Sequence, residues 1–414
     1  MKRLIGIGIC CGILILACSD RQRRNPLDPQ AEDPQDDVLR PLQALALDSQ
    51  VELRWDFSHF VDIEGYRLYR RSSGSEWGSI TEILNAGTSL YVDREVQNGT
   101  SYEYRLGLVV EDQGERFSGD SIWAVPGAEL AWIADRSTGL VWKISSDARS
   151  AHFAQGRFPD LADIAIDESD RSCWVSDRYF AGLYRIDSDG ELSTFAALIE
   201  EPGELEIDPE SRIGWLTDRA NSRVVWFSLD AADSLEVEVV DASFASPVAL
   251  AAQPGGCWIA DQSQGRVIFY QTDGGRQVEI GGLEGPMQLA AGASEEVWLL
   301  IDEGRGLLRL DRSGEILVVD LPFATALSIS VDRKTGACWA MGEQDIAVFS
   351  ALGSLEQHWT EVSGGTHLFY DPVHRRVWIS TGDALWKLTD QGEALARLDG
   401  FSSIVRIVVD PGRG

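Results

Sequence analysis

Four copies of one short pattern decide the fold of this chain: Trp132-Ile133-Ala134-Asp135, Trp174-Val175-Ser176-Asp177, Trp215-Leu216-Thr217-Asp218 and Trp258-Ile259-Ala260-Asp261. Weaker copies follow at Trp298, Trp339 and Trp378, so seven copies succeed one another at intervals of about 40 residues. Self-similarity at such a period is typical of architectures in which each copy forms one supersecondary unit.

Each copy contains the signals of four short strands. A second apolar strand follows the Trp strand, as in Leu140–Ile144, and turns such as Ser313-Gly314 come next. A segment of the type Ile164-Ala165-Ile166-Asp167 supplies a further strand. Four strands in each of seven copies predict an all-β chain whose residues 128–414 form a seven-bladed β-propeller.

The two ends of the repeat region complement each other. The first copy begins at its Trp strand near Ala131, without the strand that precedes the Trp strand in the other copies. The chain ends with a strand of that missing type, Ile404 to Asp410. We therefore expect the C-terminal strand to complete the first blade and close the ring, which removes the free sheet edges.

A different pattern precedes the repeats. Apolar and polar residues alternate with the period of a strand in Val51–Trp55, Gly65–Arg70 and Tyr102–Leu108. Turn residues such as Asn98-Gly99-Thr100 separate these segments. The alternation predicts a β-sandwich over residues 41–127.

The first residues have the composition of an export signal. Lys2 and Arg3 precede an apolar run that ends at Ala17 and is too short to span a bilayer. The residues before Cys18 resemble the lipobox of bacterial lipoproteins, which implies that residues 1–17 are cleaved and that Cys18 carries the lipid. The alternative is an ordinary signal peptide with Cys18 incidental. Residues 18–40 are polar and interrupted by Pro, and we expect a flexible tether.

Composition narrows the range of partners. The 414 residues include 36 Lys plus Arg and 66 Asp plus Glu, so the formal net charge is −30. Hydrophobic residues make up 44%, which is typical of a folded protein. So acidic a chain is repelled by nucleic acid, and we expect contact with a membrane through the N-terminal lipid only.

Two further family resemblances follow from these motifs. The repeats, with their Trp-x-x-Asp strands and aliphatic-Asp endings, resemble NHL repeats and related six- and seven-bladed propellers. The segment around Trp55, Gly65-Tyr66 and Tyr102 resembles a fibronectin type III domain, in which Tyr102 would be the corner tyrosine. Relatives of the first kind include peptide- and RNA-binding scaffolds as well as lyases and lactone hydrolases. The fold alone therefore does not choose a function.

The sequence offers little for catalysis. The five histidines are His59, His152, His358, His367 and His374. His367 is the one histidine placed to reach a central channel. A histidine at such a position is more often packed or solvated than a catalytic base. Metal-ligand spacing, a phosphate loop and a nucleophile elbow are not found. We expect no catalytic residue, no metal and no cofactor.

Two sets of repeated residues have a structural interpretation. The aspartates that end the Trp strands suit a calcium-ligand ring, but a carboxylate at a strand end also caps its own turn. Repetition in copy after copy favours the capping role. Cys173, Cys257 and Cys338 each precede a Trp in different copies, so we expect small buried side chains and no disulfides.

The residues after these aspartates are the candidates for binding. Arginine takes the next position in three successive copies, and two aromatic residues follow it in the second copy. The loops after the Trp strands and those before the inner strands should emerge on one face, with a composition favoured at recognition surfaces. The alternative is that each arginine pairs with a carboxylate of the neighbouring blade. The predicted binding residues are Arg136, Arg178, Tyr179, Phe180, Glu200, Glu201 and Arg219.

The resemblance to bacterial lipoproteins implies an exported protein that is lipid-anchored in the bacterial cell envelope. Because Ser19 follows the cysteine, the same resemblance implies the outer membrane. The propeller would bind a protein, peptide or glycan across the loop face without catalysis. The alternative is an exported propeller enzyme, a lyase or lactone hydrolase, acting in the central channel. A third interpretation is a structural part of an envelope complex.

Overall fold

The computed structural model describes residues 40–57, 63–110, 113–119, 121–154, 156–188, 190–195, 199–208, 210–230, 236–273, 275–293, 295–360, 362–381 and 383–412. The predicted signal peptide, Cys18 and the tether up to residue 39 lie outside the described residues, as does His59. Within the described ranges, no helix has the length and apolar character needed to cross a membrane.

The described chain consists of antiparallel strands, with a single 3-10 turn at Asp302–Gly304, so the predicted all-β class is confirmed. Residues 40–124 form two sheets. One sheet joins β1 (Arg40–Leu47), β2 (Gln50–Asp56) and β6 (Leu90–Asp93). The other joins β3 (Ile63–Ser72), β4 (Gly78–Ser79), β5 (Leu84–Asn85), β7 (Tyr102–Val110), β8 (Gly114–Phe117) and β9 (Ile122–Ala124).

One core lies between these two N-terminal sheets. Trp55 and Tyr66, one from each sheet, are 4% and 2% exposed and meet edge to face. Aromatic pairs prefer this arrangement because the positive ring edge faces the negative ring face. The hydroxyl of Tyr102 accepts a hydrogen bond from the backbone N–H of Gln97 at 3.0 Å, five residues upstream.

The remaining strands form seven four-stranded sheets, numbered here 1 to 7. Sheet 1 contains β10 (Leu130–Asp135), β11 (Leu140–Ile144), β12 (Ala151–Phe153) and β37 (Ile404–Asp410). Sheet 2 contains β13 (Leu161–Asp167), β14 (Ser172–Asp177), β15 (Gly182–Ile186) and β16 (Leu192–Phe195). Sheet 3 contains β17 (Pro202–Asp208), β18 (Ile213–Asp218), β19 (Arg223–Ser228) and β20 (Val237–Val239).

The later sheets follow the same order. Sheet 4 contains β21 (Pro247–Gln253), β22 (Gly256–Asp261), β23 (Arg266–Gln271) and β24 (Gly275–Gly281). Sheet 5 contains β25 (Gln288–Ala291), β26 (Val297–Ile301), β27 (Gly306–Leu310) and β28 (Ile316–Val319). Sheet 6 contains β29 (Ser328–Val331), β30 (Cys338–Met341), β31 (Ile346–Phe349) and β32 (Leu355–Trp359). Sheet 7 contains β33 (Gly365–Asp371), β34 (Arg376–Thr381), β35 (Ala384–Thr389) and β36 (Ala394–Asp399).

The Trp strands are the second strands of these sheets and are buried on both faces. Every residue of β10, β14 and β22 is buried, because each sheet is covered by a sheet on either side. This explains their unbroken apolar runs, since a strand with one solvated face would alternate instead. Cys173, Cys257 and Cys338 are free thiols, fully buried as small hydrophobic side chains.

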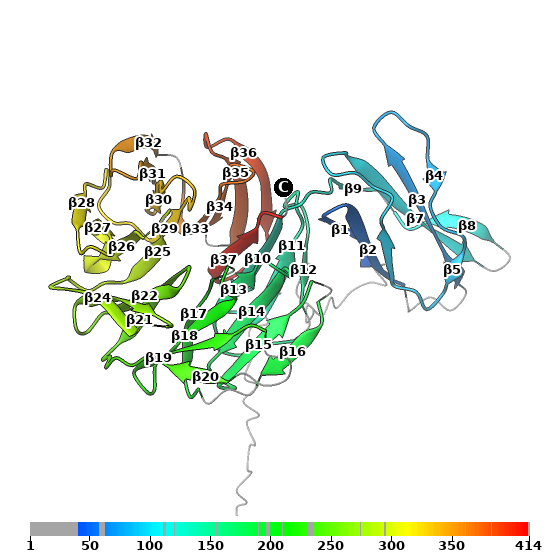
Figure 1. The fold of residues 1–414 in the computed structure, drawn as a ribbon. Coiled ribbons are helices and arrows are strands. Elements are labelled where there is room, and N and C mark those ends of the chain that lie inside the picture. The colour runs from blue at the N-terminus through cyan, green and yellow to red at the C-terminus, as the bar shows by residue number, and fades with distance from the viewer. Residues whose placement is uncertain are drawn as a thin grey trace, which may run out of the picture.

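The innermost strands of the seven sheets contact one another in a closed cycle. β13, β17, β21, β25, β29 and β33 follow in order, and β37 lies between β33 and β13 (Figure 1). β37 pairs with β10 over the register from Leu130 opposite Asp410 to Asp135 opposite Ile404. The prediction that the C-terminal strand completes the first sheet is confirmed.

The N-terminal sheets are attached to sheet 1. Backbone N–H groups of Gly127 and Ser146 donate to the carbonyls of Leu47 and Ala46 at the end of β1. Leu45 and Leu47 belong to the same buried cluster as Trp132. The two parts of the molecule therefore share apolar contacts as well as a covalent connection.

Candidate functional site

The repeated aspartates lie at the ends of the Trp strands and are fully buried. The Asp177 carboxylate accepts hydrogen bonds from the backbone N–H groups of Phe180 and Asp160, both at 2.9 Å. These residues belong to the loop after β14 and the loop before β13. Asp135 and Asp261 bond to the corresponding pairs of loops. The predicted capping role is confirmed, and we call the end of the ring that these loops form the first end.

Three arginines gather at the first end. The backbone N–H groups of Arg178 and Arg219 donate to the carbonyls of Asp160 and Glu201, in the loops before β13 and β17. Arg136 and Arg219 are exposed, and Arg178 is half-buried. Burial lowers the pKa of Arg136, and the positive charges of Arg178 and Arg219 lower it further. The three cations therefore act on one another across sheets 1 to 3.

The arginines differ in their partners. Arg178 Nη1 lies 3.1 Å from Asp160 Oδ1, a carboxylate of its own sheet. Arg136 donates to the backbone carbonyls of Leu161 at 3.1 Å and Ala162 at 3.4 Å, at the start of sheet 2. Arg219 forms no ion pair with any residue that the structure describes. Pairing of each arginine with a carboxylate of the neighbouring sheet, the alternative considered above, is not the observed arrangement.

An aromatic pair stands beside these arginines. Tyr179 and Phe180 are 70% and 56% exposed, and their rings meet edge to face with centroids 4.9 Å apart. Glu200 is exposed and Glu201 half-buried in the loop before β17. The first end thus brings together all the predicted binding residues, and it exposes two large rings to solvent.

A cluster of charges that the sequence analysis did not weigh lies inside the ring. Arg406 of β37 forms an ion pair with Glu206 of β17. Its Nε lies 3.6 Å from Asp163 Oδ1, and its Nη1 lies 3.9 Å from Glu204 Oε1. One guanidinium therefore faces three carboxylates from two other sheets, which we call the channel cluster.

Burial shifts the protonation of the channel groups. Loss of hydration raises the pKa of Glu204 to about 8, and the nearby carboxylate of Asp163 adds to the rise. Burial likewise raises the pKa of Glu206, against the effect of Arg406. Burial lowers the pKa of His367 to about 4, helped by the positive charge of Arg406. Near neutral pH the channel therefore holds a carboxyl group able to give up a proton and an uncharged imidazole.

A cavity of about 350 Å³ opens along the inner strands. Its lining mixes apolar strand residues with charged and polar ones. The polar lining includes Glu168, Glu206, Arg333, Asp371, His367 and Arg406. His367, placed in the channel by the sequence analysis, lies in this lining and approaches Thr366 Oγ1 at 3.3 Å. A cavity of this size suits a small ligand or one side chain of a larger partner.

The opposite end of the ring, the second end, is organised by ion pairs between sheets. Arg171 of sheet 2 pairs with Asp410 of sheet 1. Arg212 of sheet 3 lies 2.9 Å from Asp167 Oδ2 of sheet 2. Asp410 and Asp167 also accept backbone N–H groups of their own turns. Arg171 and Arg212 therefore hold adjacent sheets together at this end.

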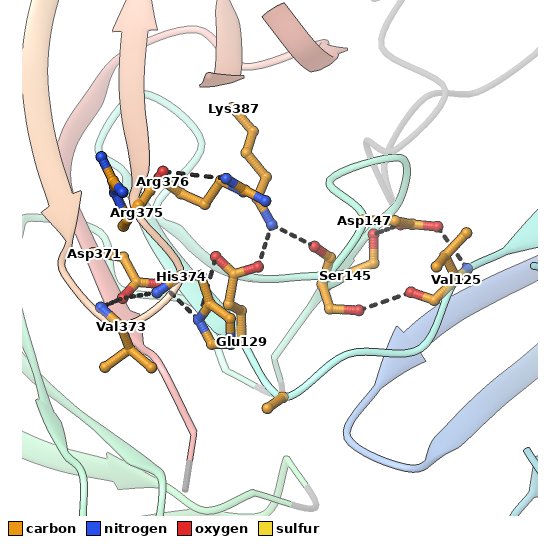
Figure 2. Close-up of polar contacts among 12 residues, drawn as sticks. Val125, Glu129, Ser145, Asp147, Asp371, Val373, His374, Arg375, Arg376 and Lys387 are labelled. Carbon is orange, nitrogen blue, oxygen red and sulfur yellow. Dashed lines mark hydrogen bonds and ion pairs between the residues drawn. The ribbon is translucent and has the colours of Figure 1, made fainter. Parts of the chain in front are cut away.

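One group of side chains in the described ranges has the spacing of metal ligands. Glu129, Asp371 and His374 bring one ligand atom each to within 4.8 Å of one another, at the junction of sheets 7 and 1 (Figure 2). In the sequence His374 is only one of five histidines, because its partner Glu129 lies in a distant part of the chain.

The channel cluster was missed for a related reason. A usable signal exists, since Glu204, Glu206 and Arg406 occupy alternate positions in otherwise apolar inner strands. Alternation marks a face that a neighbouring sheet does not cover. The sequence alone does not show that β13, β17 and β37 lie side by side, so the pairing of Arg406 with the three carboxylates could not be inferred.

Comparison with known proteins supports the fold. No protein-family model and no curated protein sequence matches this chain. Among solved structures, a functionally unknown protein from Desulfotomaculum acetoxidans has a TM-score of 0.56 at 14% identity, covering 68% of this chain and 98% of that one. A streptogramin B lyase has a TM-score of 0.52 at 14% identity, covering 61% and 87%. A putative 6-phosphogluconolactonase from Bacteroides uniformis has a TM-score of 0.53 at 13% identity, covering 68% and 99%. The neighbours are β-propeller proteins, and the likeness extends to the fold alone.

Proposed function

We propose that this chain is an exported binding protein that recognises a protein, peptide or glycan through the first end of a seven-bladed, NHL-like propeller. The seven four-stranded sheets would be the blades. The N-terminal sheets would form a fibronectin type III-like spacer, supported by the Gln97–Tyr102 hydrogen bond of a tyrosine corner.

The observation that carries this proposal is the exposed pair Tyr179 and Phe180 beside the three arginines. Aromatic and arginine side chains dominate the energy of recognition surfaces. Aromatic side chains bury much area at little entropic cost, and arginine forms strong charge-assisted hydrogen bonds. Arg219 has no described carboxylate partner, so its guanidinium is available to an acidic group of a ligand. A partner that offers an apolar group flanked by carboxylates fits this surface.

A capture experiment tests the proposal. The wild-type chain, the variant Arg136→Ala/Arg178→Ala/Arg219→Ala and the variant Tyr179→Ala/Phe180→Ala are used to capture partners from solubilised envelopes. A control replaces Arg94, Arg116 and Arg149, exposed arginines outside the first end, with Ala. Both first-end variants should lose the partner set and the control should keep it. Full retention by the first-end variants would place the binding surface elsewhere.

The location is a further part of the proposal. Cys18 would carry the lipid that anchors the chain in the cell envelope, with the outer membrane as the destination. Several acyl chains on one residue anchor stably, where one chain binds only marginally. The variant Cys18→Ala should move from the membrane to the soluble exported fraction. Unchanged partitioning of this variant would contradict the anchor.

A second candidate function is favoured by the channel. Glu204, with its pKa raised to about 8, has the property of a general acid, and the neighbouring Arg406 lines a cavity of about 350 Å³. This supports a lyase or lactone hydrolase, the classes to which two of the structural neighbours belong by name. Incubation with streptogramin B and with a sugar lactone, comparing wild type with Glu204→Gln, separates the candidates. Turnover that the variant loses would favour the enzyme.

A further inference from the structure

A buried polar cluster joins the two ends of the propeller segment. Glu129 directly precedes β10 in sheet 1, whereas Asp371 ends β33 and His374 lies in the turn before β34 in sheet 7. Glu129 is 7% exposed and Asp371 is 1% exposed. Their carboxylates lie around the His374 imidazole (Figure 2). The cluster therefore sits on the seam where the last sheet meets the first.

The ligand atoms converge on one point. His374 Nδ1 lies 2.9 Å from Asp371 Oδ2 and 3.9 Å from Glu129 Oε1. The second distance is too long for a hydrogen bond. Two atoms that each bind a common ion at about 2.0–2.2 Å lie about 3.3–3.6 Å apart in tetrahedral geometry, so a small movement of the Glu129 side chain would bring both atoms to one ion. The other oxygen of Asp371 is used by the backbone N–H of Val373 at 2.8 Å, which fixes the carboxylate.

Glu129 supplies the independent sign of a ligand. Its Oε2 accepts a hydrogen bond from Lys387, whose ammonium also donates to the Ser146 carbonyl. Its Oε1 is buried and has no hydrogen-bond partner in the described chain. A buried carboxylate oxygen without a partner is costly. An ion held between Oε1, Asp371 and His374 removes that cost.

We propose that Glu129, Asp371 and His374 bind a divalent transition-metal ion of the Zn²⁺ class and that this ion fastens sheet 7 to sheet 1. One imidazole nitrogen and two carboxylate oxygens form a donor set suited to Zn²⁺, whereas Mg²⁺ and Ca²⁺ prefer oxygen donors alone. Glu129 pairs with one ammonium, that of Lys387, and Asp371 adds a second carboxylate, so a divalent cation meets net negative charge. The His374 side chain is 32% exposed, which leaves room for water as a further ligand.

The consequence is mechanical. β37 closes sheet 1 by hydrogen bonds to β10, and the ion adds a second closure between the residue before β10 and the β33–β34 turn. Through Lys387 and Ser146 the same cluster reaches the contact with β1, where Ser146 donates to the Ala46 carbonyl. Binding would therefore stabilise the ring and its attachment to the N-terminal sheets together.

Titration of the metal-stripped full chain, carrying no polyhistidine tag, tests the proposal. Isothermal titration with ZnCl₂ should give one ion per chain, and Zn²⁺ should raise the unfolding temperature while MgCl₂ leaves it unchanged. His374→Ala should weaken zinc binding by more than about tenfold, since even residues behind metal ligands contribute that much. His358→Ala is the matched control, because His358 pairs with Asp345 at 2.9 Å, is similarly exposed and has no second carboxylate beside it.

Circular dichroism establishes that each variant is folded before titration. If His374→Ala does not fold, Glu129→Gln replaces it, since that change keeps the shape of the side chain and removes the ligand charge. Absence of zinc binding to the wild type would overturn the proposal. Equal loss in the His374 and His358 variants, or stabilisation by Mg²⁺ in place of Zn²⁺, would also overturn it.

Discussion

The two ends of the ring use the same residue types for different purposes. At the first end, buried aspartates such as Asp177 accept backbone N–H groups, and the arginines after them stay near solvent. At the second end, Arg171 and Arg212 reach the aspartates of the preceding sheet. Position relative to the strand end therefore decides whether an arginine stabilises the fold or is available to a ligand.

In this repeat protein, the two ends of the ring differ in how many of their arginines remain available to a ligand. At the first end, backbone N–H groups satisfy Asp177. Arg178 pairs there with Asp160 of its own sheet, and Arg219 forms no ion pair with a described residue. At the second end, Asp410 and Asp167 accept backbone N–H groups and in addition pair with an arginine of the neighbouring sheet, which joins adjacent sheets. The channel cluster between the ends combines both features, because Arg406 holds three carboxylates yet remains 24% exposed to the channel.

The largest effect on stability should come from deleting residues 404–414. This deletion removes β37, which takes part in interactions at the first and the second end of the ring. Sheet 1 would lose its inner strand, and Arg171 would lose Asp410. Because β10 would then present a free edge, we expect loss of cooperative thermal unfolding and a tendency to aggregate. Calorimetry and size-exclusion chromatography measure this. A control lacking only residues 413–414 should unfold as the wild type does, and a cooperative transition in the longer deletion would contradict ring closure.

Arg406→Met should have the next largest effect, about 3 kcal/mol in the free energy of unfolding at neutral pH, because it leaves buried carboxylates without their cation. Without Arg406 the folded-state pKa values of these carboxyls rise further above the unfolded values. The lost stability should therefore return as the pH falls toward about 4.5. Urea unfolding at several pH values measures this. Arg397 lies on the outer strand β36 and pairs with Asp399, which is exposed. Arg397→Met should therefore lower the free energy of unfolding only slightly, and by the same amount at every pH.

A pair of substitutions compares the two ends directly. Asp177→Ala leaves two backbone N–H groups without their acceptor and should cost about 1–3 kcal/mol. Arg212→Ala removes an arginine that is 28% exposed and should cost about 0–1 kcal/mol. Denaturant midpoints at matched slopes give both values. Equal losses would mean that the carboxylate caps and the ion pairs between sheets contribute alike.

Glu204 should give an effect that appears only as a dependence of the free energy of unfolding on pH. Its folded-state pKa of about 8 lies above the unfolded value, so its contribution to stability is full below about pH 4.5 and is lost as the pH rises through 8. Compared with Glu204→Gln, the wild type should therefore lose at least about 1 kcal/mol between pH 5 and pH 9. Urea unfolding of both proteins across this range measures the difference. Glu303→Gln, at a side chain 86% exposed, should show no such trend.

Most of the architecture could be predicted because the residues that determine each strand and turn lie within a single repeat. The apolar runs of the Trp strands predict that both faces of these strands are buried. The strand type that is missing from the first copy is found at Ile404 to Asp410. The capping aspartates could be predicted for the same reason, since a cap bonds to its own turn. Features within one repeat are accessible to sequence reasoning.

The candidate site could be predicted only where it depends on single loops. Tyr179 and Phe180 follow a strand end and are exposed, as such positions usually are. The channel cluster and the metal-ligand cluster need partners from sheets far apart in the chain. The sequence shows that Glu129 and Arg406 are charged, but the closed ring decides what they face.

The shared strands of sheet 1 also fix the order of events during synthesis. A chain made from its N-terminus presents β10 long before β37 exists, because more than half of the sequence lies between them. At about 5–20 residues per second, the edge of β10 waits on the order of tens of seconds for its partner. Until β37 is made, β10 keeps an open sheet edge, and exposed edges of this kind are prone to pair with other chains.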